Sequence, residues 1–306
     1  LLMNDPLPPG AKLGILGGGQ LGRMLSVAAS RLGFTTHIFE PGANPPAGQV
    51  AHKITTASYE DTKALQAFAQ SVDVITYEFE NIPTSALDVL EKICTIHPGR
   101  KSLAVSQDRL IEKKFLTGLG LKVAPYADVT NAEDATGAIA SIGVPSILKT
   151  RRMGYDGKGQ MRLIEASDMT SAWQVMDGAA SILEGFIDFT HEISVIAARA
   201  SDGQVACYDP GENVHKDGIL RSTQVPANLS TSQRMDAVLI AAKILNALDY
   251  VGVMGVELFV TADGFIVNEI APRVHNSGHW TQNGCDICQF EQHIRAVACW
   301  PLGDGA

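Results

Sequence analysis

The chain has 306 residues, of which 45% are hydrophobic and 19% are charged, and its formal net charge is -9. This composition is ordinary for a globular protein, and the length provides apolar material for two or three subdomains. The acidic balance argues against general binding to nucleic acids or membrane surfaces, which requires a basic surplus. Local clusters of cations must therefore hold any anionic ligand.

The cysteines and the N-terminus favour a cytoplasmic protein. Five cysteines, sparse and odd in number, argue against a disulfide framework. Cys285-x-x-Cys288 is a single pair, whereas a zinc site needs a second pair or histidines at ligand spacing. Residues 1–6 have neither the basic start nor the apolar core of a signal peptide. No apolar run approaches the ~18 residues that a membrane span requires.

Residues 1–104 alternate apolar runs with amphipathic stretches. We expect strands at residues 13–16, 35–39, 54–55 and 72–77, with helices at residues 23–32 and 59–70. This β-α-β-α-β alternation predicts a Rossmann-like domain of the α/β class, in which helices cover a parallel sheet.

The pattern changes near Pro98 and again near residue 181. Residues 105–180 predict a small α+β lid, with helices at 107–119 and 132–142 and strands at 123–126, 146–150 and 160–164. From residue 181 to residue 306, strands at 181–184, 192–198, 205–208, 253–260 and 265–270 surround a long helix at 230–248. This last part predicts a larger antiparallel-sheet domain.

A cationic, glycine-rich segment follows the apolar run at residues 144–148. It comprises the glycines Gly154, Gly157 and Gly159 and the cations Lys149, Arg151, Arg152 and Lys158. Backbone N–H groups of glycines approach phosphate oxygens closely, and the cations offset the phosphate charge. A simple β-hairpin needs only one glycine in its turn, so the segment predicts a loop that covers a polyphosphate.

The motif Gly17-x-Gly19-x-x-Gly22 has the form of the dinucleotide-binding fingerprint. Glu40 closes the next strand, where a ribose-binding acid is expected, ~20 residues on. Three interpretations stay open: the glycines bind a nicotinamide dinucleotide, they let strand and helix pack closely, or the helix N-terminus binds the phosphate of another ligand. The motif alone does not decide, because analogy of fold does not settle function.

Two acidic residues near strand ends suggest a metal site. Glu257 and Glu269 belong to apolar strands separated by a hairpin signal at residues 262–264. If these strands pair, both carboxylates share one face and, with phosphate oxygens, form a hard oxygen site suited to Mg²⁺. Asn268 adds a neutral oxygen. The alternative is a pair of solvated acids, but the neighbouring Arg273 favours a functional cluster.

Two further segments carry polar groups at positions typical of sites. The loop after Pro272 contains an arginine, two histidines, an asparagine and a serine within seven residues. Loops of this type usually bind ligands, so we predict substrate binding there. The apolar strand at 182–187, interrupted by Glu184, suits an adenine edge or an ordinary strand and turn. Glu192 is placed to accept hydrogen bonds from ribose hydroxyls.

These elements, in this order, resemble the ATP-grasp superfamily and, within it, the N5-carboxyaminoimidazole ribonucleotide synthetase family. The resemblance extends from residue 12 to residue 301. The segments that carry it are residues 17–24, 76–83, 107–109, 154–160, 212–215 and 268–280. Gly-Tyr-Asp-Gly-Lys-Gly-Gln together with His-Asn-Ser-Gly-His-Trp-Thr is more specific than any single glycine motif.

The resemblance implies a carboxylation in de novo purine biosynthesis, with ATP and Mg²⁺ as cofactors. ATP phosphorylates bicarbonate to carboxyphosphate, and the exocyclic amine of 5-aminoimidazole ribonucleotide takes up the carboxyl group as the N5-carbamate. The protein supplies positioning, charge neutralisation and exclusion of water from a labile anhydride. Relatives also suggest a homodimer.

The resemblance assigns roles residue by residue. The catalytic set is Tyr155, Asp156 and Lys158. The ATP-binding set is Arg109, Lys149, Gly154, Gly157, Gly159, Gln160, Glu184, Gly185, Phe186, Ile187, Glu192, His215, Asn268 and Glu269. The substrate-binding set is Gln20, Leu21, Glu78, Arg273, His275, Asn276 and Ser277. The metal ligands are Glu257 and Glu269. Family members continue past a Pro-Leu-Gly like residues 301–303 into a β-rich piece with further basic residues, which we expect to be absent here.

Three rival functions stay open at this point. One is an ATP-grasp ligase with another acceptor, such as a formate-using or biotin-carboxylating relative. The second is a nicotinamide-dependent oxidoreductase built on the first glycine motif. The third is a binding protein that keeps the fold and has lost turnover.

Overall fold

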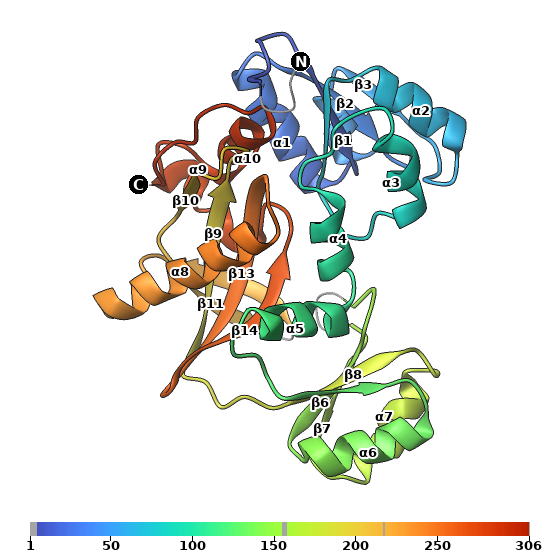
Figure 1. Cartoon of the computed structure of the whole chain (residues 1–306), viewed down its shortest axis with the longest axis vertical. Coiled ribbons are helices and arrows are strands. Elements are labelled where there is room, and N and C mark those ends of the chain that lie inside the picture. The colour runs from blue at the N-terminus through green and yellow to red at the C-terminus, as the bar shows by residue number, and fades with distance from the viewer. Residues whose placement is uncertain (1–4, 155–157, 217, 306) are drawn as a thin grey trace.

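The computed structural model describes residues 5–154, 158–216 and 218–305. Three sheets form three regions, with the N-terminal region at the top of the view in Figure 1 and the lid at the bottom. The N-terminal region contains a parallel sheet with the order β3-β2-β1-β4, built from β1 (Lys12–Leu16), β2 (Thr35–Phe39), β3 (Lys53–Thr55) and β4 (Val74–Tyr77). The helices that accompany it are α1 (Gln20–Arg31), α2 (Thr62–Gln70) and α3 (Thr84–Leu90). The predicted Rossmann-like sheet is thus confirmed.

Capping groups decide where two of the predicted helices begin. The helix expected at 59–70 begins at Thr62, because the side chain of Asp61 accepts a hydrogen bond from the N–H of Ala64. The helix expected at 107–119 is α5 (Arg109–Gly118), and Asp108 caps it in the same way. An aspartate at this position satisfies N–H groups that have no partner within the helix.

The lid sheet is antiparallel, with the order β5-β8-β6-β7. Its strands are β5 (Tyr126–Val129), β6 (Ser146–Thr150), β7 (Gln160–Leu163) and β8 (Ser181–Gly185), and α6 (Ala132–Ile142) and α7 (Asp168–Val175) pack on it.

Two strand predictions for this region were wrong. The strand expected at 123–126 lies three residues later, as β5. The strand expected at 181–184 belongs to the lid sheet as β8, between β5 and β6, and not to the larger sheet. Leu183 packs there against Leu148 and Leu163. An apolar run shows that a strand is buried but does not identify its partners. The domain limits at 104/105 and 180/181 stay predictions.

The larger sheet has the order β12-β11-β9-β13-β14, and β10 pairs with β9. Its strands are β9 (His191–Arg199), β10 (Val205–Cys207), β11 (Gly211–Lys216), β12 (Ile219–Gln224), β13 (Gly252–Thr261) and β14 (Gly264–Ala271). One face packs under α8 (Thr231–Ala247), through alternate residues such as Ile193, Val195 and Val256. The other face is turned to the centre of the molecule.

Segments far apart in sequence join the N-terminal region to the larger sheet. The helix α10 (Gln289–Val297) packs against α1 and β13, and the residues of this contact form one continuous core. His293 is fully buried in it. Its Nε2 lies 2.8 Å from Thr76 Oγ1 on β4, and its Nδ1 accepts from the N–H of Val253 on β13 over 3.0 Å. Within the described ranges, no helix has the length and apolarity needed to cross a membrane.

Candidate active site

A cleft of about 920 Å³ lies where the three regions meet. Its walls come from the lid strands, the start of α5, the exposed face of β13 and β14, and the loop after β14. Lys158 of the lid and Glu269 of the larger sheet both line it. The predicted site residues that line it are Gln20, Arg109, Lys149, Gly154, Lys158, Gln160, Glu192, His215, Glu257, Asn268, Glu269, Arg273, His275, Asn276 and Ser277.

Other predicted site residues lie elsewhere. Those of the described part that do not line the cleft are Leu21, Glu78, Gly159, Glu184, Gly185, Phe186 and Ile187. Tyr155, Asp156 and Gly157 lie outside the described residues. The assigned roles of all these residues stay predictions.

Two carboxylates face the cleft from neighbouring strands. Glu257 on β13 lies directly opposite Glu269 on β14. Burial and the negative charge of Glu269 raise the pKa of Glu257. Burial acts on Glu269 in the same direction, but Arg109, whose Nη1 donates to Glu269 Oε2 over 3.1 Å, lowers its pKa. Asn268 Nδ2 donates to Glu257 Oε2 over 3.4 Å.

This donor set fits a divalent cation. Hard cations prefer carboxylate and amide oxygens, and Mg²⁺ is usually bound by one or two carboxylates together with substrate phosphates. The side chain of Glu257 is only 13% exposed, and its charged form needs a further positive partner. Among the described residues no group of three or more acidic, imidazole or thiol side chains could hold a metal ion.

The cations of the cleft are paired with acids of the same site. Lys149 Nζ donates to Glu184 Oε2 over 2.9 Å, and the Glu184 side chain is only 5% exposed. Lys113, on α5, lies 3.8 Å from the other oxygen of Glu184 and donates to the carbonyl oxygen of Asn268 over 2.8 Å. Glu184 thus acts here through its side chain, as the buried partner of two lysines.

Our sequence reasoning missed Lys113 and Glu112. Both are buried, and burial raises the pKa of Glu112. Glu112 lines the cleft with Arg109. Positions 109, 112 and 113 are three and four residues apart, which places them on one face of a helix. This charged face, next to the predicted phosphate-binding arginine, was the signal available in the sequence.

Asp108 joins the start of α5 to the base of the glycine-rich segment. Its Oδ1 accepts from the N–H groups of Leu110 and Ile111, over 3.0 and 3.3 Å. Arg151 donates to the same carboxylate from Nε and Nη2, over 3.0 and 2.7 Å. The N–H of Arg109 donates to the carbonyl of Arg151 over 2.9 Å. Arg109 is therefore held in register with the strand that carries Lys149.

Asp108→Asn should lower the free energy of unfolding by about 1–2 kcal/mol at pH 7, because asparagine keeps the cap but loses the paired charge. Burial raises the pKa of Asp108, but hydrogen bonds from Arg151 and the backbone outweigh it and lower the pKa. A carboxyl with a lowered folded-state pKa contributes stability above its unfolded pKa of about 3.9 and loses it as the pH falls through the folded value.

The difference in the free energy of unfolding between wild type and Asp108→Asn should therefore become smaller below about pH 4. Urea denaturation across the pH range measures this. If the two proteins differed in free energy of unfolding by the same amount at pH 7 and at pH 3.5, the charge of Asp108 would not be the source of the stabilisation.

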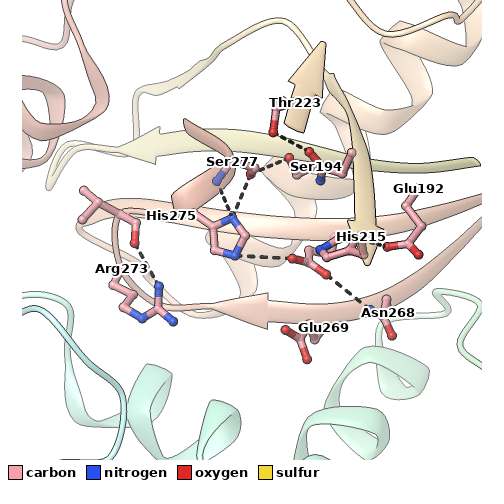
Figure 2. Close-up of polar contacts among 12 residues, drawn as sticks. Glu192, Ser194, His215, Thr223, Asn268, Glu269, Arg273, His275 and Ser277 are labelled. Carbon is pink, nitrogen blue, oxygen red and sulfur yellow. Dashed lines mark hydrogen bonds and ion pairs between the residues drawn. The ribbon is translucent and has the colours of Figure 1, made fainter. Parts of the chain in front are cut away.

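The loop after β14 is held by partners from three other segments. Arg273 Nε donates to Glu80 Oε2 over 2.7 Å, and Glu80 follows β4. His275 and Ser277 are buried, and they contact Glu257 of β13 and Ser194 of β9 (Figure 2). Burial, and then the charge of Arg273, lower the pKa of His275 to about 3, so it is neutral.

A second imidazole–carboxylate pair lies on β11 and β9 of the larger sheet. His215 Nδ1 on β11 lies 2.7 Å from Glu192 Oε2 on β9 (Figure 2). The hydrogen bond with Glu192 raises the pKa of His215, although burial opposes it. Both residues line the cleft, as expected for residues beside a nucleotide.

The N–H groups of the first glycine motif donate to two glutamates of the chain itself, Glu78 and Glu40. Glu78 accepts hydrogen bonds from the N–H groups of Gly19 and Gly22 at the start of α1. Glu40 accepts from the N–H of Gly18 over 2.8 Å. A Cβ at Gly22 would lie 2.9 Å from the carbonyl oxygen of Gly17. These contacts favour the interpretation that the glycines serve close packing, over the dinucleotide interpretation.

Sequence and structure comparisons agree on the family. The chain matches the ribonucleotide synthetase preATP-grasp domain over residues 10–107 and the ATP-grasp domain over residues 114–290. It is 52% identical to the N5-carboxyaminoimidazole ribonucleotide synthase of Brucella melitensis, over 97% of this chain and 83% of the relative.

Two solved structures are similar over nearly the whole chain. A synthetase of the same name in complex with ADP has a TM-score of 0.96 and 43% identity, and covers 99% of this chain and 81% of its own. The Aspergillus clavatus enzyme in complex with ADP and the aminoimidazole ribonucleotide has a TM-score of 0.90 and 30% identity, over 96% and 78%. With these likenesses added to the cleft and its paired charges, the chain belongs to the N5-carboxyaminoimidazole ribonucleotide synthase family of the ATP-grasp superfamily.

Proposed function

We propose that this chain carries out the reaction of its family, the ATP- and bicarbonate-dependent carboxylation of 5-aminoimidazole ribonucleotide in purine biosynthesis. One observation supports this most. Lys149 and Lys158 of the lid lie in the same cleft as Glu257 and Glu269 of the larger sheet. Cations on one wall and metal-binding carboxylates on the other are what phosphoryl transfer from ATP requires.

ATP would bind by replacing pairs that already exist in the cleft. Arg109 and Lys149 now contact Glu269 and Glu184, and both cations lie where phosphate oxygens would take over part of these contacts. Glu192 would accept from the ribose, beside His215. Mg²⁺ bound by Glu257 and Glu269 would neutralise charge on the transferring phosphoryl group. The preformed charges lower the reorganisation that binding requires.

The chemistry has two balanced steps. An oxygen of bicarbonate attacks the γ-phosphorus of ATP, the bond to the β-phosphate oxygen breaks, and ADP leaves with carboxyphosphate formed. The bond between the carboxyl carbon and the phosphate oxygen then breaks, which releases CO₂ and phosphate. The exocyclic amine of the ribonucleotide adds to the CO₂ carbon, and the proton that it loses passes to the phosphate. Lys158 would bind the carboxyphosphate oxygens, and Tyr155 and Asp156 keep their proposed catalytic roles. Closing the cleft to water protects the mixed anhydride.

The ribonucleotide would bind on the side of the cleft formed by the loop after β14. Arg273 offers a guanidinium that Glu80 holds in place, and a fixed guanidinium suits planar or phosphate recognition. Asn276 and Gln20 line the same side. A homodimer, which rests on the family resemblance, and a cytoplasmic location, which rests on the sparse and odd-numbered cysteines, remain parts of the proposal.

The test is ADP release with bicarbonate, measured with and without 5-aminoimidazole ribonucleotide. We expect ADP release to depend on the ribonucleotide, because the amine consumes the activated carboxyl group. ADP release at the same rate with and without the ribonucleotide, or only in the presence of formate, would favour an ATP-grasp ligase with another acceptor. Tight NAD(H) binding without ATP binding would favour an oxidoreductase. ATP binding with no bicarbonate-stimulated turnover would identify a protein that only binds.

A further inference from the structure

A row of residues crosses the cleft-facing side of the larger sheet, and one of them has no role so far. Glu257 on β13 lies directly opposite Glu269 on β14 and directly opposite Ser194 on β9. Opposed residues on antiparallel strands point to the same face. Ser194 therefore shares the face of the two carboxylates. It is only 2% exposed and does not line the cleft, so it does not touch a ligand there.

Buried polar contacts lead from Ser194 through Ser277 to His275 in the loop after β14 (Figure 2), and from His275 to Glu257. Ser194 Oγ donates to Ser277 Oγ over 2.6 Å. Ser277 Oγ lies 2.8 Å from His275 Nδ1. On the other side of the ring, His275 Nε2 lies 3.4 Å from Glu257 Oε1. Four side chains from three elements thus form one path that ends at a proposed metal ligand.

These contacts determine which nitrogen of His275 carries the proton. The backbone N–H of Ser277 points at Nδ1 over 3.4 Å, and a backbone N–H only donates. Nδ1 is therefore an acceptor, so the Ser277 hydroxyl donates to it and accepts from Ser194. An imidazole whose Nδ1 accepts carries its proton on Nε2, which faces Glu257.

Gly255 leaves the space beside β13 in which the His275 side chain packs. A Cβ added at Gly255 would lie 2.7 Å from Cγ and 2.8 Å from Cβ of His275. Both distances are shorter than non-bonded carbons tolerate, and the two atoms are close to the His275 backbone, so a small rotation of the ring does not relieve them. Gly255 does not have a positive φ, so alanine there would displace His275 without straining the strand.

We infer that Ser194 and Gly255 are positioning residues, which hold His275 as its Nε2–H tautomer against Glu257 and so keep the substrate loop and the metal carboxylate in one arrangement. The role given to Glu257 rests on the proposed function, whereas the tautomer does not. Neither Ser194 nor Gly255 contacts substrate, so their effect passes through His275.

The tautomer is measured first, in the wild-type protein without ligands. Nitrogen-15 NMR of labelled histidines, with His275 identified by the loss of its signals in His275→Asn, distinguishes a protonated from an unprotonated ring nitrogen. We expect Nδ1 unprotonated and Nε2 protonated, and a mixture of the two forms in Ser194→Ala. A protonated Nδ1 in the wild type would overturn the inference, and this measurement requires no variant of Ser194 to fold.

Kinetics and metal binding then test the consequence. Ser194→Ala should lower kcat/KM for the ribonucleotide about 10-fold, the effect of one lost buried hydrogen bond, while the KM for ATP changes less than about 2-fold. Gly255→Ala should lower kcat/KM for the ribonucleotide about 100-fold, because overpacking moves the imidazole ring of His275. Mn²⁺ binding to the ATP complex, followed by electron paramagnetic resonance, should weaken in both variants.

Ser102→Ala is the matched control. Its hydroxyl, on α4 (Arg100–Ser106), is buried and has no hydrogen-bond partner among the described residues. This variant should keep wild-type kinetics and metal binding. Wild-type kinetics and metal binding in both Ser194→Ala and Gly255→Ala would overturn the positioning role and leave the proposed function standing. Absence of ribonucleotide-dependent turnover in the wild type would overturn the proposed function, whereas the inferred tautomer of His275 would be unaffected.

Discussion

Glu269→Gln should lower turnover by about 10²–10³-fold and leave the fold intact. The substitution keeps the shape of the side chain and removes one of the two charges that face the proposed metal position. Loss of one electrostatic contact to a developing charge typically has an effect of this size. The residue contributes little to a core, because its side chain is 39% exposed, so thermal unfolding should change little.

The same variant separates metal binding from nucleotide binding. Arg109 loses its carboxylate partner in Glu269→Gln and becomes free to contact phosphate. We therefore expect ATP binding without Mg²⁺, measured by calorimetry, to stay equal or tighten, while the gain from added Mg²⁺ is largely lost. Glu60→Gln, an exposed carboxylate of the N-terminal region, is the control. Near-normal turnover of Glu269→Gln at saturating Mg²⁺ would refute the metal assignment.

The acidic pair could be predicted because its geometry is local. Glu257 and Glu269 belong to two strands of one hairpin, so the short turn at residues 262–264 brings them near each other. Their direct opposition was not predictable from the turn, because a register shift between Glu257 and Leu258 leaves Asn268 as an extra residue and brings Glu269 opposite Glu257. The glycine-rich segment is also short, since β6 and β7 on either side of it form a hairpin. In both cases the chain that connects the functional residues is short.

Contacts between distant segments could not be predicted in this way. The carboxylate of Glu184 pairs with Lys149 and Lys113, a role that its predicted place at an adenine edge did not indicate. This pairing depends on β8 lying beside β6 in the lid, which no periodicity reveals. In the sequence, Ser194 is a polar residue within an apolar strand, with no sign of a partner. The register between β9 and β13 places it opposite Glu257.

Two strands were missed for a different reason. In β12 no residue is buried, and β11 has only two buried residues. β12 lies at the edge of the sheet, and its sequence, Ile-Leu-Arg-Ser-Thr-Gln, has no sustained apolar alternation. Edge strands that border a polar cleft lack the signal that identifies buried strands.

Lys149→Met should weaken ATP affinity at least about 10-fold and also destabilise the protein. The affinity falls because a charge-assisted contact to phosphate is lost. The stability falls because, within the described ranges, Glu184 keeps only Lys113, at 3.8 Å, as an ion-pair partner. Removing one member of a buried ion pair typically costs about 3–5 kcal/mol. A loss of activity in this variant alone would therefore not distinguish a phosphate contact from a damaged lid.

The double variant Lys149→Met/Glu184→Gln separates the two effects. It removes the unpaired buried charge, so the free energy of unfolding should recover by several kcal/mol relative to Lys149→Met. Lys113 keeps its hydrogen bond to the carbonyl oxygen of Asn268, which limits the loss on that side. ATP affinity, measured by calorimetry, should remain weak, because the phosphate still lacks the ammonium group. If affinity returned together with stability, Lys149 would be a structural partner of Glu184 and not a ligand of the nucleotide.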